Sequence, residues 1–257
     1  MIVFVGAGPG ASDLITVRGQ KFLKEADIIV YAGSLVNPAL LDVKKEGCEV
    51  YNSARMTLGE VLEVLVNGAA AGKKVVRLHT GDPCLYGAVK EQMDALAEKG
   101  VPYEVCPGVS SFCGAAAALE AEYTLPGVSQ SVVITRMAGR TPVPEGESIR
   151  SFAAHGATMV IFLSTGMLPA LQEELIAGGY DGDTPAAVVY KATWPEENVC
   201  RCTVETLAET AEEEGITKTA LIVVGRVLDG SYEHSKLYDP AFGTEFRKAA
   251  AGGQEHE

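Results

Sequence analysis

The stretch IVFVGAGPGASD, residues 2–13, joins an apolar run to a glycine-rich turn. Its first residues have the apolar, β-branched composition of a buried strand, and the glycines after them suit a turn that leads from a strand into a helix. A glycine loop in this position is typical of nucleotide-binding βα units. The stretch therefore predicts an α/β fold that begins with a buried strand, and it leaves open which ligand the loop binds.

Strands and helices alternate along the first half of the chain. Thr57 and Glu60 have the spacing of a capping box at the start of one predicted helix, and Gly100 ends another. Such an alternation predicts a mostly parallel sheet. We expect strands at 2–8, 26–33, 74–83 and 102–108, and helices at 14–26, 57–72, 87–100 and 110–120. The apolar residues expected on the inner face of the first helix are Leu14, Val17, Phe22 and Leu23.

The pattern changes beyond residue 118, where a second set of strands and helices begins and a Pro-rich, acidic loop follows its first strand. We expect strands at 131–139, 157–165, 186–195, 199–207 and 219–228, and helices at 169–180 and 205–215. The sequence thus predicts two α/β domains, at residues 1–118 and 119–243. The last residues, 244–257, have little apolar surface to bury, so we expect a disordered tail.

Composition narrows the class of protein. A net charge of -13 argues against wholesale binding to nucleic acid or to an anionic membrane. No apolar run approaches the roughly 20 residues of a membrane-spanning helix, and the N-terminus does not resemble a signal peptide, so we expect a cytoplasmic protein. The six cysteines form no CxxC pair, which favours reduced thiols and predicts no metal site.

Three glycine turns each follow a predicted strand in the first half: Gly6–Gly10, Thr80–Pro83 and Pro107–Ser111. The carboxyl ends of parallel strands meet at one edge of a sheet, and ligands of open α/β sheets bind there. Glycine at such a position lets the backbone approach a ligand closely, although βα turns are often glycine-rich without any ligand. The three turns together favour a shared binding cleft.

The ligand does not fit the NAD pattern. A dinucleotide fingerprint has the spacing GxGxxG and an acidic residue at the end of the second strand, where it binds a ribose hydroxyl. Here the spacing is GxGxG with Pro9 inside, and the second strand is followed by Ala32 and Gly33. Asp27 stands at the wrong end of that strand. No GK[ST] follows the loop, which excludes a P-loop.

An ordered series of motifs resembles the tetrapyrrole methylases, which use S-adenosylmethionine (SAM). The motifs of the first half are GAGPGASDLITVRG (6–19), ADIIVYAGSLVNP (26–38), TGDPCLYG (80–87) and PGVSS (107–111). Those of the second half are ATMVIFLSTG (157–166), AAVVYKATWPEE (186–197), TALIVVG (219–225) and SKLYDPAF (235–242). The resemblance implies two α/β domains with a ligand cleft between them, a homodimer, and methylation of a corrin precursor, precorrin-4 or cobalt-precorrin-4, at ring carbon 11.

The resemblance also implies which residues contact SAM. The implied cofactor-binding residues are Pro9, Thr80, Gly81, Asp82, Ser110, Ser111, Leu163, Ala187 and Ala220. For some of them a structural role explains the residue equally well. Leu163, Ala187 and Ala220 have the character of core residues, and Asp82 can simply cap its own turn.

A tetrapyrrole with acetate and propionate arms needs local positive charge on an acidic protein, and arginine suits carboxylates best. The substrate-binding candidates are Arg55 and Lys191, with Tyr190 and Trp194 to cover the ring, and Arg136, Arg140 and His79 as further basic residues near strand ends. The alternative is that each charge is a solvated surface group and that Trp194 belongs to the core.

Methylation at carbon requires no nucleophilic side chain and no metal, because the cofactor supplies the reactive methyl group and the protein supplies positioning. We name no catalytic residue. Four alternatives stay open at this point: a tetrapyrrole methylase acting at a different ring position, a relative that methylates protein or RNA, a dinucleotide-binding oxidoreductase, and a non-catalytic ligand-binding module.

Overall fold

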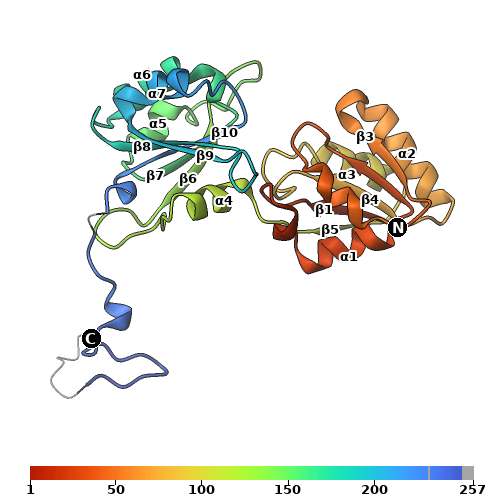
Figure 1. Ribbon diagram of the computed structural model, residues 1–257, viewed down its shortest axis with the longest axis horizontal. Helices are drawn as coiled ribbons and strands as arrows, with labels where there is room; N and C mark the ends of the chain where they lie inside the picture. The colour runs from red at the N-terminus through yellow and green to blue at the C-terminus, as the bar shows by residue number, and fades with distance from the viewer. Residues whose placement is uncertain (231, 251–257) are drawn as a thin grey trace. The chain divides into compact units, whose positions relative to one another are not determined.

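The computed structural model describes residues 1–230 and 232–250 (Figure 1). Two compact units form: Met1–Glu120 with Val189–Val199 and Lys218–Leu221, and Ala121–Val188 with Cys200–Thr217 and Ile222–Glu257. Part of the tail expected at 244–257 lies outside the described residues. Across the residues that the model does describe, no helix combines the length and the apolar character needed to cross a membrane.

The first unit is built on a parallel sheet, as the alternating pattern predicted. Its strands lie in the order β3-β2-β4-β1-β5, and all neighbours run parallel. The strands are β1 (Ile2–Gly6), β2 (Ile28–Tyr31), β3 (Glu49–Asn52), β4 (Val75–His79) and β5 (Tyr103–Cys106). Strand β3 was not predicted, because EVYN is an edge strand with no buried residue and therefore lacks an apolar run.

Helices cover both faces of this sheet (Figure 1). They are α1 (Val17–Glu25), α2 (Leu58–Ala70) and α3 (Lys90–Glu98), and a fourth helix, α4 (Ser111–Ala118), follows β5. Val3 and Val5 of β1 pack in one core cluster with Leu23 of α1, while Ile2 and Phe4 belong to the cluster of the opposite face. This alternation along β1 follows from the two-residue period of a strand, and it explains why every residue of β1 is buried.

The ends of two helices test the sequence patterns directly. The capping box of Thr57 and Glu60 is confirmed at the start of α2. The inner face predicted for the first helix was wrong at Leu14 and Val17, because both are exposed, and Val17 is 89% exposed. Thr16 is the N-cap of α1, and its hydroxyl accepts from the N–H of Gly19, so the helix begins later than predicted.

The second unit carries a mixed sheet in the order β6-β7-β10-β8-β9. The strands are β6 (Val132–Arg136), β7 (Thr158–Phe162), β8 (Pro185–Tyr190), β9 (Asn198–Thr203) and β10 (Ala220–Val224). Strand β7 runs parallel to β6 and antiparallel to β10. Helices α5 (Ile149–Ala153), α6 (Leu168–Gly178) and α7 (Leu207–Glu213) gather beside this sheet (Figure 1). The predicted fold class, two α/β domains, is confirmed.

Candidate functional site

The three glycine turns of the first unit meet at one edge of its sheet. They follow β1, β4 and β5, which are neighbours in the sheet, so their carboxyl ends are adjacent. Gly8 and Gly81 form an antiparallel bridge, in which the N–H of Gly8 donates to the carbonyl of Gly81 (3.2 Å) and the N–H of Gly81 donates back (2.9 Å). The predicted convergence of the turns is therefore confirmed.

Two of the glycines are required by the contact between the turns themselves. A Cβ placed on Gly6 would lie 2.5 Å from the Cα of Gly108, and one placed on Gly108 would lie 2.2 Å from the carbonyl oxygen of Gly81. No real Cβ comes so close to a backbone atom. The structural explanation of these glycines is thus sufficient, and they need no ligand to account for them.

Gly81 differs from them. Its φ of +60° lies in the left-handed region, and a Cβ there would meet the Cα of Ser110 only at 3.5 Å, an ordinary contact. The conformation therefore favours glycine at this position, and the third glycine turn lies against it in ordinary van der Waals contact. Gly81 itself is buried, and its N–H and its carbonyl are both used in the bridge to Gly8.

Asp82 ties two turns together. Its carboxylate accepts from the N–H of Cys84 (2.8 Å) and from the N–H of Gly108 (2.8 Å), so it caps its own turn and holds the next one. Burial acts to raise the pKa of Asp82, but the hydrogen bonds from Cys84 and Gly108 outweigh it and hold the pKa below the usual value. The side chain is ionised at neutral pH and still half-buried at the edge of the site.

The start of α4 provides hydroxyl groups beside these turns. Ser110 is buried and is the N-cap residue of α4, yet its side chain makes no capping hydrogen bond. A Cβ on Gly114, one turn further along α4, would lie 2.9 Å from the Cβ of Pro9. The first turn of α4 therefore packs against the first glycine turn, and Pro9, Ser110 and Ser111 belong to one local cluster.

The position where NAD-binding proteins carry an acid is closed in this chain. A Cβ on Gly33, just after β2, would lie 2.1 Å from the side-chain oxygen of Asn52 at the end of β3. Asn52 is itself held in place, because that oxygen accepts from the N–H of Ala54 (3.0 Å). No carboxylate can occupy this point without moving Asn52, which supports the exclusion of NAD drawn from the glycine spacing.

The residues KATWPEE (191–197), which follow β8, pack on the first glycine turn and belong to the first unit. The hydroxyl of Thr193 accepts from the N–H of Ala11 (3.0 Å). A Cβ on Gly10 would lie 2.2 Å from Cδ1 of Trp194, so the indole ring sits directly against Gly10. Sequence reasoning missed this contact.

The basic residues proposed from the sequence differ in their exposure and in the partners that their side chains already have. Arg55 is exposed at the end of a short turn after β3. The ammonium of Lys191 lies 3.5 Å from the carboxylate of Glu196 and over the rings of Tyr190 and Trp194. The guanidinium of Arg136 donates to carbonyls of its own loop, and Arg140 is exposed.

Strand β4 holds two basic side chains, Arg77 and His79, whose burial the sequence pattern did not reveal. The guanidinium of Arg77 donates to Gln92 (3.0 Å) and to the carbonyl of Val30 (3.2 Å), and burial lowers its pKa to about 10, so it remains charged. His79 is 4% exposed and stacks against Phe4, and its Nε2 has no partner among the described residues. Burial, together with the charge of Arg77, lowers the pKa of His79 to about 3. His79 is therefore neutral and cannot attract a substrate carboxylate by charge.

The pKa of His79 predicts a pH dependence of stability. Folded His79 stays neutral down to about pH 3, whereas in the unfolded chain it takes up a proton near pH 6.5. Its contribution is therefore complete above pH 6.5 and is lost as the pH falls, by about 1.5 kcal/mol between pH 6.5 and 5. Urea unfolding of the wild type and of His79→Phe, which cannot titrate, should show this slope in the wild type alone. Equal slopes would refute the buried neutral state.

In the second unit, Leu163 directly follows β7, has a φ of +52° and is 63% exposed. A bulky apolar residue held in the left-handed region and left exposed is costly, which favours a role at a binding surface. Ala187 of β8 is completely buried, and Ala220, which begins β10 and is grouped with the first unit, is buried as well. Those two positions have the environment of ordinary core residues.

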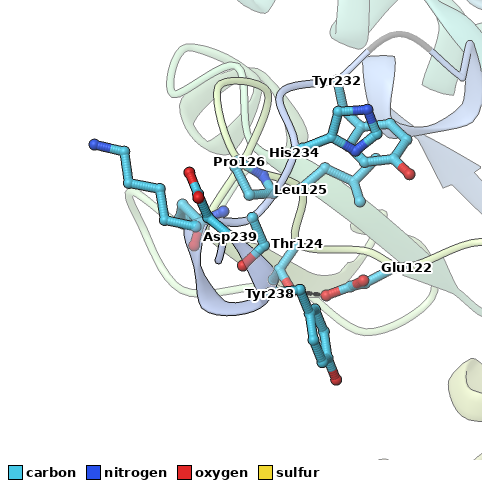
Figure 2. A pocket seen from close by; sticks show the side chains of 11 residues that line it. Glu122, Thr124, Leu125, Pro126, Tyr232, His234, Tyr238 and Asp239 are labelled. Carbon is cyan, nitrogen blue, oxygen red and sulfur yellow. Dashed lines mark hydrogen bonds between the residues drawn. The ribbon is translucent and has the colours of Figure 1, made fainter. Parts of the chain in front are cut away.

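Two further observations concern chemistry outside the turns. The six cysteines are free thiols, and among the residues with a described placement no group of His, Cys, Asp and Glu has the arrangement of a metal site. The late motif SKLYDPAF lies beside a cavity of about 800 Å³ in the second unit, to which it contributes Ser235, Lys236, Tyr238 and Asp239 (Figure 2). None of the predicted cofactor residues lines this cavity.

Comparison with known proteins agrees with the geometry. Residues 1–208 match the model of the tetrapyrrole (corrin/porphyrin) methylases. A relative from Methanocaldococcus jannaschii, named cobalt-precorrin-4 C(11)-methyltransferase, is 53% identical over 96% of both chains. Further relatives at 43% to 48% identity include proteins named precorrin-4 C(11)-methyltransferase, without cobalt.

Solved structures extend the comparison. The structure of the cobalt precorrin-4 methyltransferase CbiF has a TM-score of 0.87 and 47% identity, covering 89% of this chain and 95% of that one. A uroporphyrin-III C-methyltransferase from Thermus thermophilus, in complex with S-adenosyl homocysteine (SAH), has a TM-score of 0.73 and 29% identity, covering 91% of this chain and 95% of that one.

Proposed function

The chain belongs to the tetrapyrrole (corrin/porphyrin) methylases, and from this membership together with the site we infer its activity. It is a SAM-dependent C-methyltransferase of corrin biosynthesis, which methylates a precorrin-4 substrate at ring carbon 11. The observation that best supports this function is the meeting of three glycine turns at one edge of a parallel sheet, in a chain that has Gly33 packed against Asn52 where an NAD-binding protein carries an acid.

The residues present fit the cofactor. Gly81 has a left-handed backbone beside the start of α4, the carboxylate of Asp82 is ionised, and the hydroxyl of Ser110 is not used as a helix cap. We propose that these groups hold SAM. The proposed contacts of the first unit are Pro9, Thr80, Gly81, Asp82, Ser110 and Ser111. We also propose Leu163 of the second unit, and for the buried Ala187 and Ala220 only that their small size shapes the strand surface.

When bound, SAM supplies an electrophilic methyl group on a sulfonium, and the electron-rich ring carbon takes it up. The chain itself contributes the positioning of the two reactants. Asp82 fixes the second and third glycine turns by its two hydrogen bonds, so the groups around the cofactor are already ordered. Holding two reactants in line can account for several kcal/mol of the barrier, on the order of 7 or more in favourable cases.

The substrate side needs positive charge. We propose that Arg55, which is exposed, binds a carboxylate arm of the tetrapyrrole, and that Tyr190 contacts the ring. Lys191 and Trp194 were candidates for the same task from the sequence, but their side chains already have partners within the first unit. We also propose that the chain acts as a homodimer in the cytoplasm, where free thiols persist.

The cobalt content of the substrate is a separate proposal. We propose that the natural substrate is cobalt-precorrin-4, and the cobalt in the names of the relative at 53% identity and of the structure at 47% identity supports it. Here cobalt is part of the substrate, and the protein needs no metal site of its own.

One experiment tests both the reaction and the substrate. The protein is incubated with methyl-labelled SAM and precorrin-4, with and without cobalt, and the product is analysed by mass spectrometry and NMR. We expect one labelled methyl group at ring carbon 11, formed faster on the cobalt substrate. A label on a different ring carbon would contradict the assigned position, and a faster reaction without cobalt would contradict the cobalt proposal alone.

A further inference from the structure

The segment 191–197 packs against the first glycine turn. Its contacts with that turn are the hydrogen bond from the N–H of Ala11 to the hydroxyl of Thr193 (3.0 Å) and the close approach of the Trp194 ring to Gly10. Helix α4 packs on both the turn and the segment, because a Cβ on Gly114 would lie 2.9 Å from the Cβ of Pro9 and 3.2 Å from the side chain of Thr193. Pro9 and Gly10 are buried as a result.

The segment itself is held in an unusual conformation. Lys191 and Thr193 have φ values of +45° and +69°, in the left-handed region that non-glycine residues rarely adopt. The N–H of Lys191 donates to the carbonyl of Thr219 (3.1 Å), and the N–H of Thr193 donates to the carboxylate of Glu197. Such a conformation persists only where the surroundings impose it, and it is concentrated at functional sites.

Lys191 completes the arrangement. Its ammonium lies 5.3 Å from the centre of the Trp194 ring and 5.6 Å from that of Tyr190, within the range of cation–π contacts. Glu196 pairs with the same ammonium at 3.5 Å. The indole ring is thus fixed on one side by Gly10 and is held by a cation on its ring.

We propose that Thr193 and Trp194 are positioning residues for the cofactor turn at Gly6–Gly10, and that Lys191 acts through Trp194. They hold the turn in the shape that binds SAM and do not bind the tetrapyrrole. This inference rests on the proposed cofactor site and assigns residues to it that the three glycine turns alone did not include. It also explains why position 10 is glycine, since any side chain there would overlap the indole.

The test compares matched variants by calorimetric titration with SAH. Trp194→Ala and Thr193→Val should weaken SAH binding about tenfold, whereas Trp194→Phe keeps a ring and Thr193→Ser keeps the acceptor, so both should stay within about threefold of the wild type. Thr217→Val, at an exposed threonine, is the control. In steady-state kinetics, the first two variants should raise KM for SAM and leave KM for the tetrapyrrole nearly unchanged.

The sequence offers an independent signal, because Trp194 is the only tryptophan of the chain. Binding of SAH to the wild type should change the tryptophan emission, and Thr193→Val should reduce that change at full occupancy. Folded Trp194→Ala with wild-type SAH affinity, or a raised KM for the tetrapyrrole alone, would overturn the inference. Failure of the wild type to bind SAH in calorimetry would instead overturn the proposed function as well.

Discussion

Replacing Gly108 by alanine should destabilise the first unit by about 2 to 3 kcal/mol, the cost of forcing a methyl group into a filled site. The added Cβ would lie 2.2 Å from the carbonyl oxygen of Gly81 and 2.7 Å from the Cα of Gly6, and both of these are backbone atoms that no side-chain rotation can move aside. The turns must separate, which also endangers the bond from the N–H of Gly108 to Asp82. Urea unfolding monitored by circular dichroism measures the loss.

A matched glycine shows what the same substitution does without the clash. Gly59 lies in the first turn of α2 with nothing within 4 Å of its Cβ position, so Gly59→Ala should be neutral or stabilising by up to about 1 kcal/mol. In Gly108→Ala, by contrast, the turns separate and the residues proposed to contact the cofactor separate with them. The SAH affinity of this variant should therefore fall by at least tenfold. A stable Gly108→Ala protein would show that the three turns can rearrange independently.

Most of the fold could be predicted from the sequence because its strands consist of long apolar runs. IVFV and IIVY are buried almost throughout, and parallel order followed from the helices between such strands. Strand β3 and helix α5 were missed for physical reasons. The first is a half-exposed edge strand that pairs with β2 only, and the second is a five-residue helix after a Pro-rich loop. Neither has enough buried residues to show a period.

Part of the candidate site could be predicted from the sequence, namely the residues whose position depends on the order of the strands alone. Turns after neighbouring parallel strands must lie together, so the cluster of Gly8, Gly81 and Gly108 could be predicted without coordinates. The contact of Trp194 with Gly10 could not, because it joins segments far apart in the sequence and has no local period; the neighbouring bond between Ala11 and Thr193 spans 182 residues. The burial of His79 was also hidden, since VVRLH has the alternation of a half-exposed strand while the whole strand is buried.

Gly81→Val should weaken SAM binding at least tenfold, a change that needs only about 1.4 kcal/mol. Gly81 has a φ of +60°, which costs an L residue roughly 1 to 2 kcal/mol and a β-branched one more. The new side chain would also start 3.5 Å from the Cα of Ser110 and the N of Ser111, among the proposed cofactor contacts. Two causes of weaker binding, backbone strain and occupied space, are therefore combined in this variant.

Gly81→Asn separates the two causes, because asparagine tolerates the left-handed conformation but still places a side chain above the turn. If the cofactor lies against the backbone of Gly81, both variants should lose at least tenfold in SAH affinity, while the melting temperature of Gly81→Asn stays close to that of the wild type. Calorimetric titration and thermal unfolding of the two proteins give both quantities. Folded Gly81→Asn that binds SAH as tightly as the wild type would remove this turn from the cofactor site, since strain alone would then explain the valine variant.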